Sequence, residues 1–506
     1  YISLVCASSL LLSGCMDSED ELKAELLANV DSGEGAQVSA GSANFSKFVS
    51  VGNSITAGLM DAALYNAGQA RSYPKLISEQ MLLAGGGAFN QPDINSQDGY
   101  NISVAQPGTV VVGRFVLDVS IPGPVPLLTG DVPTAYAGNK SALNNFGVPG
   151  ARVVDLLSPA YAANPLYARF ASAPGTSTIL GDAAAANGTF ISIWIGQNDL
   201  LGYLTSGGTS EDVADNPAAI LNPRSLTDVP NFTGALAAVA GTLSAGGSKG
   251  GVITNLLDAT FTPFFRAVPN NAIPLSQGFV DQLNASFGGF NAALNGLAAL
   301  DPSFSQADAD ERKVFYQVGQ NAILIEDDNL VDISAKLASI SPLLAPYGQT
   351  RQMKASANPL KHELVLLSAA PVLNTSPAGA PPTVLYGISW PLPDKYTLTS
   401  DELTLHATRL AQFNAAIAAQ ASASNLALVD AYTLFISTAI GGGIVIDGVK
   451  LKPDFSPNGI FSTDGIHPNA RGQAIIANKL IDAINAKYGS TLNQVDVLNL
   501  PGINLL

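Results

Sequence analysis

A serine and a histidine that lie far apart in the chain are of the types that together perform acyl transfer. The first of the two is Ser54. It lies in FVSVGNSITAGLMD (residues 48–61), where an apolar run breaks at Gly52 and a helix-like segment follows. A serine at such a junction lies at a helix N-terminus, where backbone N–H groups favour the negative charge of a nucleophile. Serine also caps many helices, so this stretch alone leaves both interpretations open.

His467 is the second. It follows Asp464 by three residues in GIFSTDGIHPNARGQ (residues 459–473), just before the last expected helix. At this spacing the carboxylate can accept a hydrogen bond from Nδ1–H, which leaves Nε2 to take a proton from a serine. A solvated turn is the alternative interpretation of the same spacing.

The chain has only two other histidines. We expect His362, before an apolar run, at the surface or at a strand edge. We expect His406 on the polar face of a helix that begins at the TSDE segment, where Thr399 and Glu402 have capping-box spacing.

Short apolar runs alternate with helical patterns after residue 45, which is typical of an α/β sheet. The third run, residues 190–199, is almost continuously apolar, as a buried parallel strand is. The five expected strands are KFVSVG (47–52), SALNNFGVPG (141–150), FISIWIGQND (190–199), GGVITNLLDAT (250–260) and SNLALVDAY (424–432), and the two clearest helices cover residues 73–85 and 470–488.

Two insertions interrupt this alternation. Residues 270–400 exceed the length of a plain crossover and include RKVFYQVG (312–319) and NAILIED (321–327), which could pair as strands. The segment predicts an elaboration of one domain, such as a cap or lid. Another insertion covers about residues 85–140 and is rich in Gly, Pro and Val.

Composition limits the partners. With 47% hydrophobic and 13% charged residues, the 506-residue chain is expected to be globular. A formal net charge of −16 argues against a nucleic-acid partner. No His or Cys pair has metal-ligand spacing, and IEDDNLVD (325–332) lacks the glycine and spacing of a calcium loop and is expected to be a solvated turn. We therefore expect no cofactor and no metal.

The N-terminal stretch YISLVCASSLLLSGCMDSEDE is an apolar run that ends in small residues and a cysteine. Leu12-Ser13-Gly14-Cys15 resembles a bacterial lipoprotein signal-peptidase site, which implies that Cys15 becomes the acylated first residue. A short transmembrane anchor or a plain secretory signal are the alternatives. Residues 16–45 are acidic, rich in small residues and aperiodic, and predict a flexible tether. The expected location is outside the cytoplasm, lipid-anchored to a bacterial membrane.

Four segments in order resemble the conserved blocks of the SGNH hydrolases, also called GDSL esterases and lipases. The segments are VGNSITAG with Ser54, NNFGVPGAR with Gly150, IGQND with Asn198 and Asp199, and DGIHP with Asp464 and His467. The resemblance implies a three-layer α/β/α, flavodoxin-like fold with a parallel sheet.

It also implies a catalytic triad of Ser54, His467 and Asp464. The Ser54 N–H, the Gly150 N–H and the Asn198 side-chain amide would form an oxyanion hole, with Asp199 supporting the loop. One position departs from the family, because Asn53 stands where its first block usually has Asp. Asn keeps the size and hydrogen bonding of Asp but loses its charge.

The sequence thus predicts a serine esterase that hydrolyses carboxylic esters of small molecules, lipids or carbohydrates. Its organisation would be a signal peptide (1–15), a tether (16–45), a hydrolase domain (46–490) with insertions at about 85–140 and 270–400, and a tail (491–506). The alternatives are a lipase or phospholipase for longer acyl chains, or a catalytically inactive surface binding protein on the same scaffold.

Overall fold

A five-stranded parallel sheet lies at the centre of the computed structural model, which describes residues 38–102, 104, 109–118, 124–245, 250–356, 358 and 362–503. Its strands are β1 (Phe48–Gly52), β6 (Asn145–Gly147), β7 (Phe190–Trp194), β8 (Gly250–Thr254) and β15 (Ala427–Val429). All five expected strands are therefore confirmed. Every residue of β1 and β7 is buried, as expected for strands covered on both faces.

The strand order in space is β6–β1–β7–β8–β15, and each neighbouring pair is parallel. In order along the chain this is 2-1-3-4-5, the flavodoxin-like arrangement. The chain leaves β1 in one direction toward β6 and returns on the other side with β7. Sheets of this kind bind ligands in the crevice at such a switch point, outside the carboxyl ends of the strands. Ser54 follows β1 and Asn198 follows β7, so the topology brings both to this edge.

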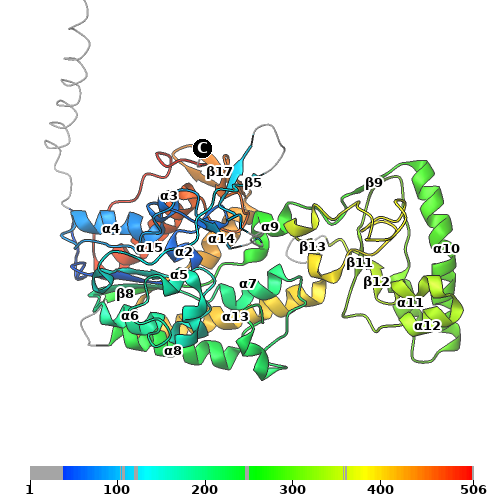
Figure 1. The fold of residues 1–506 in the computed structure, drawn as a ribbon, viewed down its shortest axis with the longest axis horizontal. Helices are drawn as coiled ribbons and strands as arrows, with labels where there is room; N and C mark the ends of the chain where they lie inside the picture. Colours follow the sequence, from blue (N-terminus) through cyan, green and yellow to red (C-terminus); the bar gives the residue numbers. More distant parts are fainter. Residues whose placement is uncertain are drawn as a thin grey trace, which may run out of the picture.

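Helices cover both faces of the sheet, which confirms the three-layer fold. Helices α4 (Tyr73–Leu83) and α15 (Ala470–Tyr488) pack together on one face (Figure 1). Helices α6 (Ile179–Ala185), α8 (Val229–Ser244) and α13 (Ser400–Ala423) cover the other.

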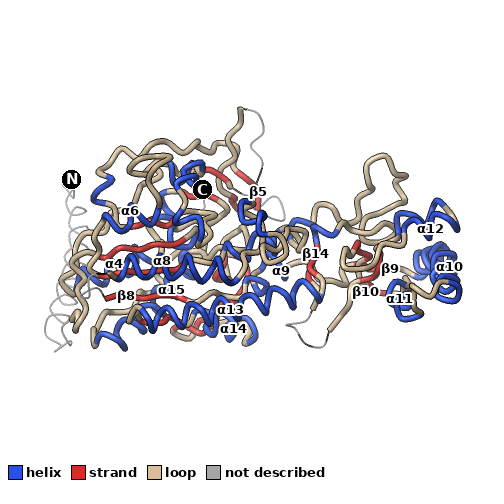
Figure 2. Tube along the Cα trace, turned by 90° about the horizontal axis from the view of Figure 1, so that it is seen from below, coloured by secondary structure: helices blue, strands red, loops and turns tan. Residues whose placement is uncertain are grey.

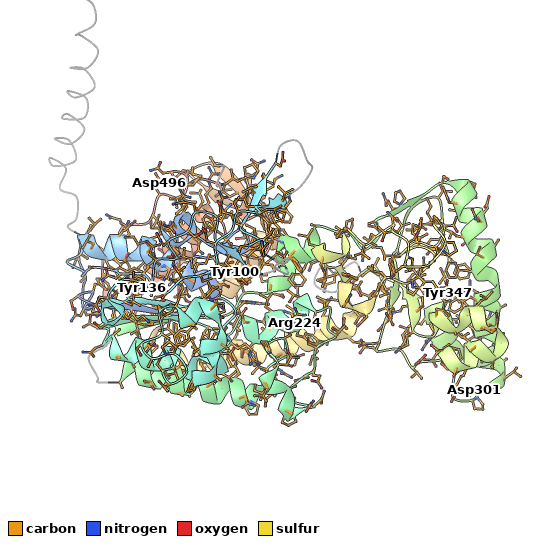
Figure 3. The ribbon with its side chains drawn as sticks, viewed as in Figure 1. Tyr100, Tyr136, Arg224, Asp301, Tyr347 and Asp496 are labelled. Carbon is orange, nitrogen blue, oxygen red and sulfur yellow. The ribbon has the colours of Figure 1, made fainter. Side chains whose placement is uncertain are left out.

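Most of the long insertion forms a lobe beside the sheet domain (Figures 1 and 2). It contains α10 (Gln277–Leu300), α11 (Gln306–Arg312), α12 (Ser334–Ile340), β9 (Ile273–Leu275), β10 (Gly319–Asn321), β11 (Leu324–Glu326) and β12 (Thr350–Gln352). The lobe has its own hydrophobic core, and Tyr347 packs within it against Phe287, Phe290 and Trp390 (Figure 3).

The strand pairing expected inside this lobe is wrong. RKVFYQVG and NAILIED do not pair with each other, because β10 pairs with β9 and β11 pairs with β12. The IEDDNLVD turn is largely exposed, as expected, but Asp327 within it is not. Asp327 is buried and forms an ion pair with Arg351 at 2.6 Å. Arg351 also forms an ion pair with the buried Glu363 at 2.6 Å. These charged side chains can be buried because each is paired with a side chain of opposite charge.

A narrow neck connects the lobe to the sheet domain. Strand β13 (Leu364–Val365) pairs with β14 (Thr397–Leu398), and α13 begins directly afterwards. The expected capping box of Thr399 and Glu402 is present at its first turn.

Shorter elements complete the described chain. In the insertion near residue 100, β2 (Ala63–Leu64) pairs with β3 (Tyr100–Asn101), and β4 (Phe115–Leu117) pairs with β5 (Pro124–Pro126). The remaining helices and strands are α2 (Ser54–Ala57), α3 (Asn66–Gln69), α5 (Pro165–Ala168), α7 (Asn198–Thr205), α9 (Pro263–Arg266), α14 (Ala431–Ile440), β16 (Ile444–Ile446), β17 (Val449–Phe455) and β18 (Gly459–Phe461).

The first described residues are part of the folded domain. Ser42 N–H donates to the Tyr488 carbonyl at 2.8 Å, and Thr491 N–H donates to the Ser39 carbonyl at 2.9 Å. Phe45 is 2% exposed and packs edge-on against Phe190 with ring centroids 4.9 Å apart. The expected tether of residues 16–45 therefore does not extend to residue 45, because residues 38–45 bind residues near the other end of the chain. The expected signal peptide with Cys15, and residues 16–37, lie outside the described residues.

Among the described residues, no helix is long and apolar enough to cross a membrane.

The contact of Phe45 leads to a prediction about stability. Phe45→Ala should lower the free energy of unfolding by about 3–5 kcal/mol, because it removes a fully buried ring and leaves a cavity. Denaturant unfolding would measure the change. The matched control is Phe279→Ala on α10, where the ring is 62% exposed, and it should change stability by about 0.5 kcal/mol or less. Equal effects of the two substitutions would contradict the assignment of Phe45 to the core.

Candidate active site

Ser54 is the first residue of α2, directly after β1. The side chain of Asn53 caps this short helix, with Oδ1 accepting from the Ile55 N–H at 3.1 Å. A Cβ at Gly52 would lie 2.4 Å from the Trp194 carbonyl oxygen, so a glycine lets β1 approach β7 just before the serine. Asn53 therefore has a capping role that needs an acceptor oxygen but no charge.

The structure brings Ser54 and His467 into contact across 413 residues of sequence. His467 Nε2 lies 2.9 Å from Ser54 Oγ, and His467 Nδ1 lies 2.8 Å from Asp464 Oδ2. With Nδ1–H donating to the carboxylate, Nε2 carries the lone pair that faces the hydroxyl. The arrangement can take a proton from the serine and keep the resulting imidazolium beside a negative charge.

Asp464 is held by four N–H donors. Oδ1 accepts from the backbone N–H groups of Ile466 and His467, each at 2.8 Å. Oδ2 accepts from the Ala62 N–H at 2.8 Å and from the imidazole. Burial acts to raise the pKa of Asp464, but the charge and hydrogen bond of His467 and these backbone donors hold it below its usual range. The carboxylate thus stays ionised although it is buried.

Sequence reasoning missed Asp61, which fastens the catalytic turn to the chain after α2. Asp61 Oδ1 accepts from Thr463 Oγ1 at 2.7 Å and from the Thr463 N–H at 3.1 Å. Its own N–H donates to Ser462 Oγ at 2.9 Å, and Oδ2 accepts from the Tyr65 hydroxyl at 2.7 Å. The available signal was an acid inside the otherwise apolar run GLMDAAL, where an unpaired charge would be costly.

The three expected oxyanion donors lie at the ends of β1, β6 and β7. Within the described part of the chain, neither the Ser54 N–H nor the Gly150 N–H has a hydrogen-bond acceptor. The Asn198 amide donates one N–H to the Ala151 carbonyl at 2.9 Å, which leaves its second N–H for another acceptor. Gly150 has φ of +82°, a conformation that favours glycine.

Asp199 lies beneath the loop that carries Gly150. Its Oδ2 accepts from the Val153 N–H at 2.9 Å, so it connects the start of α7 to this loop. Burial raises the pKa of Asp199 to about 7, although the hydrogen bond from Val153 acts to lower it. At low pH the buried carboxyl group is therefore neutral.

A pocket of about 350 Å³ of empty space, partly open to solvent, adjoins Ser54 and His467. Asn198 lines it, while Leu201, Leu257 and Ile466 supply apolar surface. An apolar cavity beside a serine hydroxyl suits the acyl part of an ester.

The expectation for His406 is wrong, because this residue is buried behind the pocket wall. It is 1% exposed, and its Nε2 lies 3.1 Å from Asp258 Oδ1. Asp258 also accepts from Thr260, and its neighbours Leu257 and Ala259 line the pocket. The helix pattern around Thr404 and Thr408 predicts a polar face, but the partner carboxylate lies 148 residues away in sequence.

Asp199 leads to a prediction about pH. A carboxyl group with a raised folded-state pKa contributes stability that is fully present below its unfolded pKa of about 4 and is lost as pH rises through about 7. Asp199→Asn cannot ionise, so between pH 4 and 8 its unfolding free energy should improve relative to the native chain by on the order of 4 kcal/mol.

Denaturant unfolding at several pH values would measure this difference, with the exposed Asp215→Asn as control. A native-minus-variant difference that is flat with pH would contradict the neutral buried state of Asp199.

The comparisons with known proteins give one match. The model of the family described as GDSL-like Lipase/Acylhydrolase matches residues 223–480, about half of the chain. This range includes Asp464 and His467, whereas Ser54, Gly150 and Asn198 lie before it. No curated protein and no solved structure matches the chain. The family match supports hydrolysis of the esterase or lipase type in general.

Proposed function

We propose a reaction for this chain, which belongs to the GDSL-like lipase/acylhydrolase family: hydrolysis of carboxylic esters by Ser54, His467 and Asp464. The observation that carries the proposal is the chain of two contacts, 2.9 Å from Ser54 Oγ to Nε2 and 2.8 Å from Nδ1 to Asp464. Both distances are within hydrogen-bond range, and both ring nitrogens are engaged.

In the first half-reaction, Ser54 Oγ attacks the ester carbonyl carbon while His467 Nε2 takes its proton. The tetrahedral oxyanion would be stabilised by the Ser54 and Gly150 N–H groups and the second N–H of Asn198. His467 then donates the proton to the departing alcohol, which leaves an acyl-serine. Water, deprotonated by His467, attacks that acyl group. His467 then returns the proton to Ser54 Oγ as the acyl–Oγ bond breaks, which releases the acid and restores the serine. Asp464 keeps the histidine tautomer in place throughout.

The apolar pocket surface of Leu201, Leu257 and Ile466 beside Ser54 suits an apolar acyl group, and its length can be measured directly. A panel of p-nitrophenyl esters from acetate to palmitate would separate an esterase from a lipase.

Loss of the nucleophile or the base should abolish turnover. Ser54→Ala and His467→Ala should each lower kcat by about 1,000-fold or more while the fold is retained, because the two side chains act as a unit. The p-nitrophenyl ester assay measures the loss, and circular dichroism checks the fold. Ser46→Ala, at an exposed serine just before β1, should retain full activity.

A fluorophosphonate probe should label Ser54 in the native chain and nothing in Ser54→Ala. Turnover that survives in either variant, or a label on another serine, would refute the triad. A folded chain that hydrolyses no ester in the panel would favour the inactive binding scaffold.

The proposal includes the expected lipid anchor at Cys15, on the sequence evidence of Leu12-Ser13-Gly14-Cys15 alone. Expressed with its leader, the protein should enter the membrane fraction, and detergent should release it, because the several acyl chains of a lipoprotein bind almost irreversibly. Cell fractionation would show Cys15→Ser soluble or unprocessed.

The matching control is a chain that begins at Val38, which retains the packed residues 38–45 and should be soluble and fully active. Membrane association of Cys15→Ser equal to that of the native leader would refute acylation as the anchor.

A further inference from the structure

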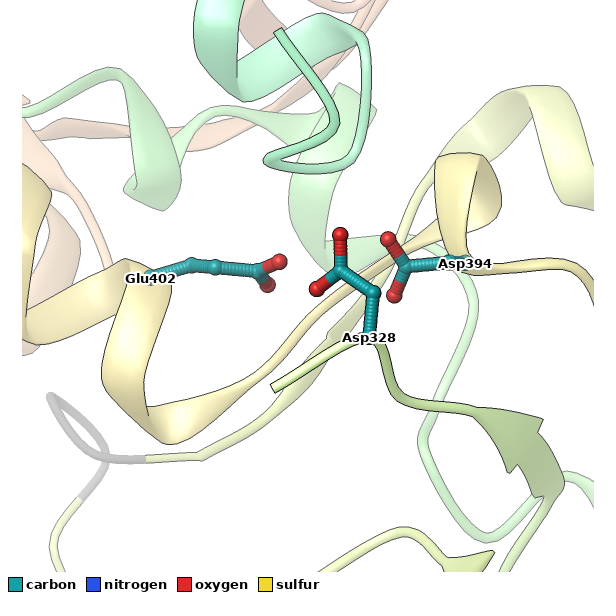
Figure 4. A group of neighbouring side chains, drawn as sticks. All are labelled: Asp328, Asp394 and Glu402. Atoms are coloured by element: carbon teal, nitrogen blue, oxygen red, sulfur yellow. The ribbon is translucent and has the colours of Figure 1, made fainter. Parts of the chain in front are cut away.

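Three carboxylates converge where the lobe joins the sheet domain, and the site of Ser54 and His467 uses none of them. Asp328 lies in the turn after β11, Asp394 begins the short helical turn Asp394–Tyr396, and Glu402 lies in the first turn of α13 (Figure 4). Glu402 also caps α13, because its Oε2 accepts from the Thr399 N–H at 2.5 Å. One oxygen from each lies within 4.8 Å of the other two. Two oxygens bound to one Ca²⁺ at 2.3–2.6 Å are separated by at most about 5 Å, so these three fit around a single ion.

Asp394 supplies a second and independent observation. Its side chain is 7% exposed, and neither of its carboxylate oxygens has a hydrogen-bond partner within the described residues. Both oxygens point toward Asp328 and Glu402 (Figure 4). A carboxylate buried in this way without a partner is expensive, and a cation bound between the three side chains would offset that cost.

No basic side chain compensates the cluster. Across the described residues, no Lys, Arg or His lies within 4.0 Å of any of the three carboxylates. Lys395 follows Asp394 directly, but its Nζ lies over the ring of Tyr396 at 5.1 Å from the centroid. Burial and the neighbouring carboxylates raise the pKa of Asp394 to about 9 and that of Glu402 to about 7. The site thus lacks positive charge.

Two glycines bring the sheet domain close to the cluster. Gly207 and Gly208 follow α7 with φ of +67° and +74°. A Cβ on Gly207 would lie 2.5 Å from the carbonyl carbon of Lys395, and one on Gly208 would lie 2.3 Å from Glu402 Oε1. The loop after α7 therefore closes one side of the cluster, while the exposed Asp328 leaves another side accessible to an ion and its water ligands.

We propose that Asp328, Asp394 and Glu402 bind one Ca²⁺ ion that fastens the lobe to the sheet domain. Three carboxylates without nitrogen or sulfur ligands suit a hard cation, and the flexible coordination of Ca²⁺ tolerates ligands from three separate segments. The segment IEDDNLVD lacks the spacing of a calcium loop because it supplies only one of the three proposed ligands, Asp328. The other two ligands lie 66 or more residues later. The proposal is independent of the esterase reaction.

Calorimetric titration and thermal unfolding test this site in the full chain. After removal of cations with EDTA, the protein should bind one Ca²⁺, and a free concentration 100 times the Kd should raise its Tm by about 3 °C. Asp394→Asn should abolish both the binding and the shift. In EDTA the same variant should have a Tm equal to or above that of the native chain, because neither oxygen of Asp394 has a hydrogen-bond partner among the described residues that the amide would lose.

Asp328→Asn is the second variant, since a change at this exposed residue leaves the fold intact and should weaken Ca²⁺ binding about tenfold or more. The matched control is Asp281→Asn on the outer helix α10, which should bind Ca²⁺ like the native chain. A native Tm that Ca²⁺ does not move would show that the carboxylates share protons and would overturn the site. Ca²⁺ binding that survives in both Asp394→Asn and Asp328→Asn would place the ion elsewhere and would also overturn the proposed site.

Discussion

The ionised, buried carboxylate of Asp464 is the constraint on which the site depends. Its two oxygens accept from four N–H groups, three of the backbone and one of His467. Without these donors, burial would favour the neutral acid, which could neither select the histidine tautomer nor stabilise an imidazolium. The donor from Ala62 comes from the chain just after α2. The same hydrogen bond that keeps Asp464 charged therefore fixes the distance between the catalytic turn and the nucleophile helix.

Helix α7 runs from the pocket beside Ser54 to the base of the lobe. At its start, Asn198 and Asp199 bind the Ala151 carbonyl and the Val153 N–H, which holds the loop of Gly150 in place. After its end, Gly207 and Gly208 lie against the base of the lobe. The loop of Gly150 and the base of the lobe therefore both contact the same eight-residue helix or the residues directly after it.

The sequence predicted the elements whose signals are local. The strands are apolar runs, α13 has its capping box, and Ser54, Asp464 and His467 stand in short motifs at the ends of such elements. The failures share a physical cause, which is a partner distant in sequence. His406 is buried because Asp258 lies opposite it, and Asp327 is buried because Arg351 does. Residues 38–45 join the folded domain because Tyr488, the last residue of α15, and Thr491 after it form hydrogen bonds with them. A polar residue looks exposed in a sequence whenever its partner cannot be seen.

The same long-range pairs explain how the fold accommodates an insertion of this size. The closure entropy of a loop grows only slowly with its length, so the requirement is that the two ends be held together. Here β13 pairs with β14, and Val268 bridges to Val365 across the base of the lobe. Asp258 and His406 join the chain that enters the lobe to the helix that leaves it. Because Leu257 and Ala259 line the pocket, the contact that closes the insertion is also the one that holds the pocket wall.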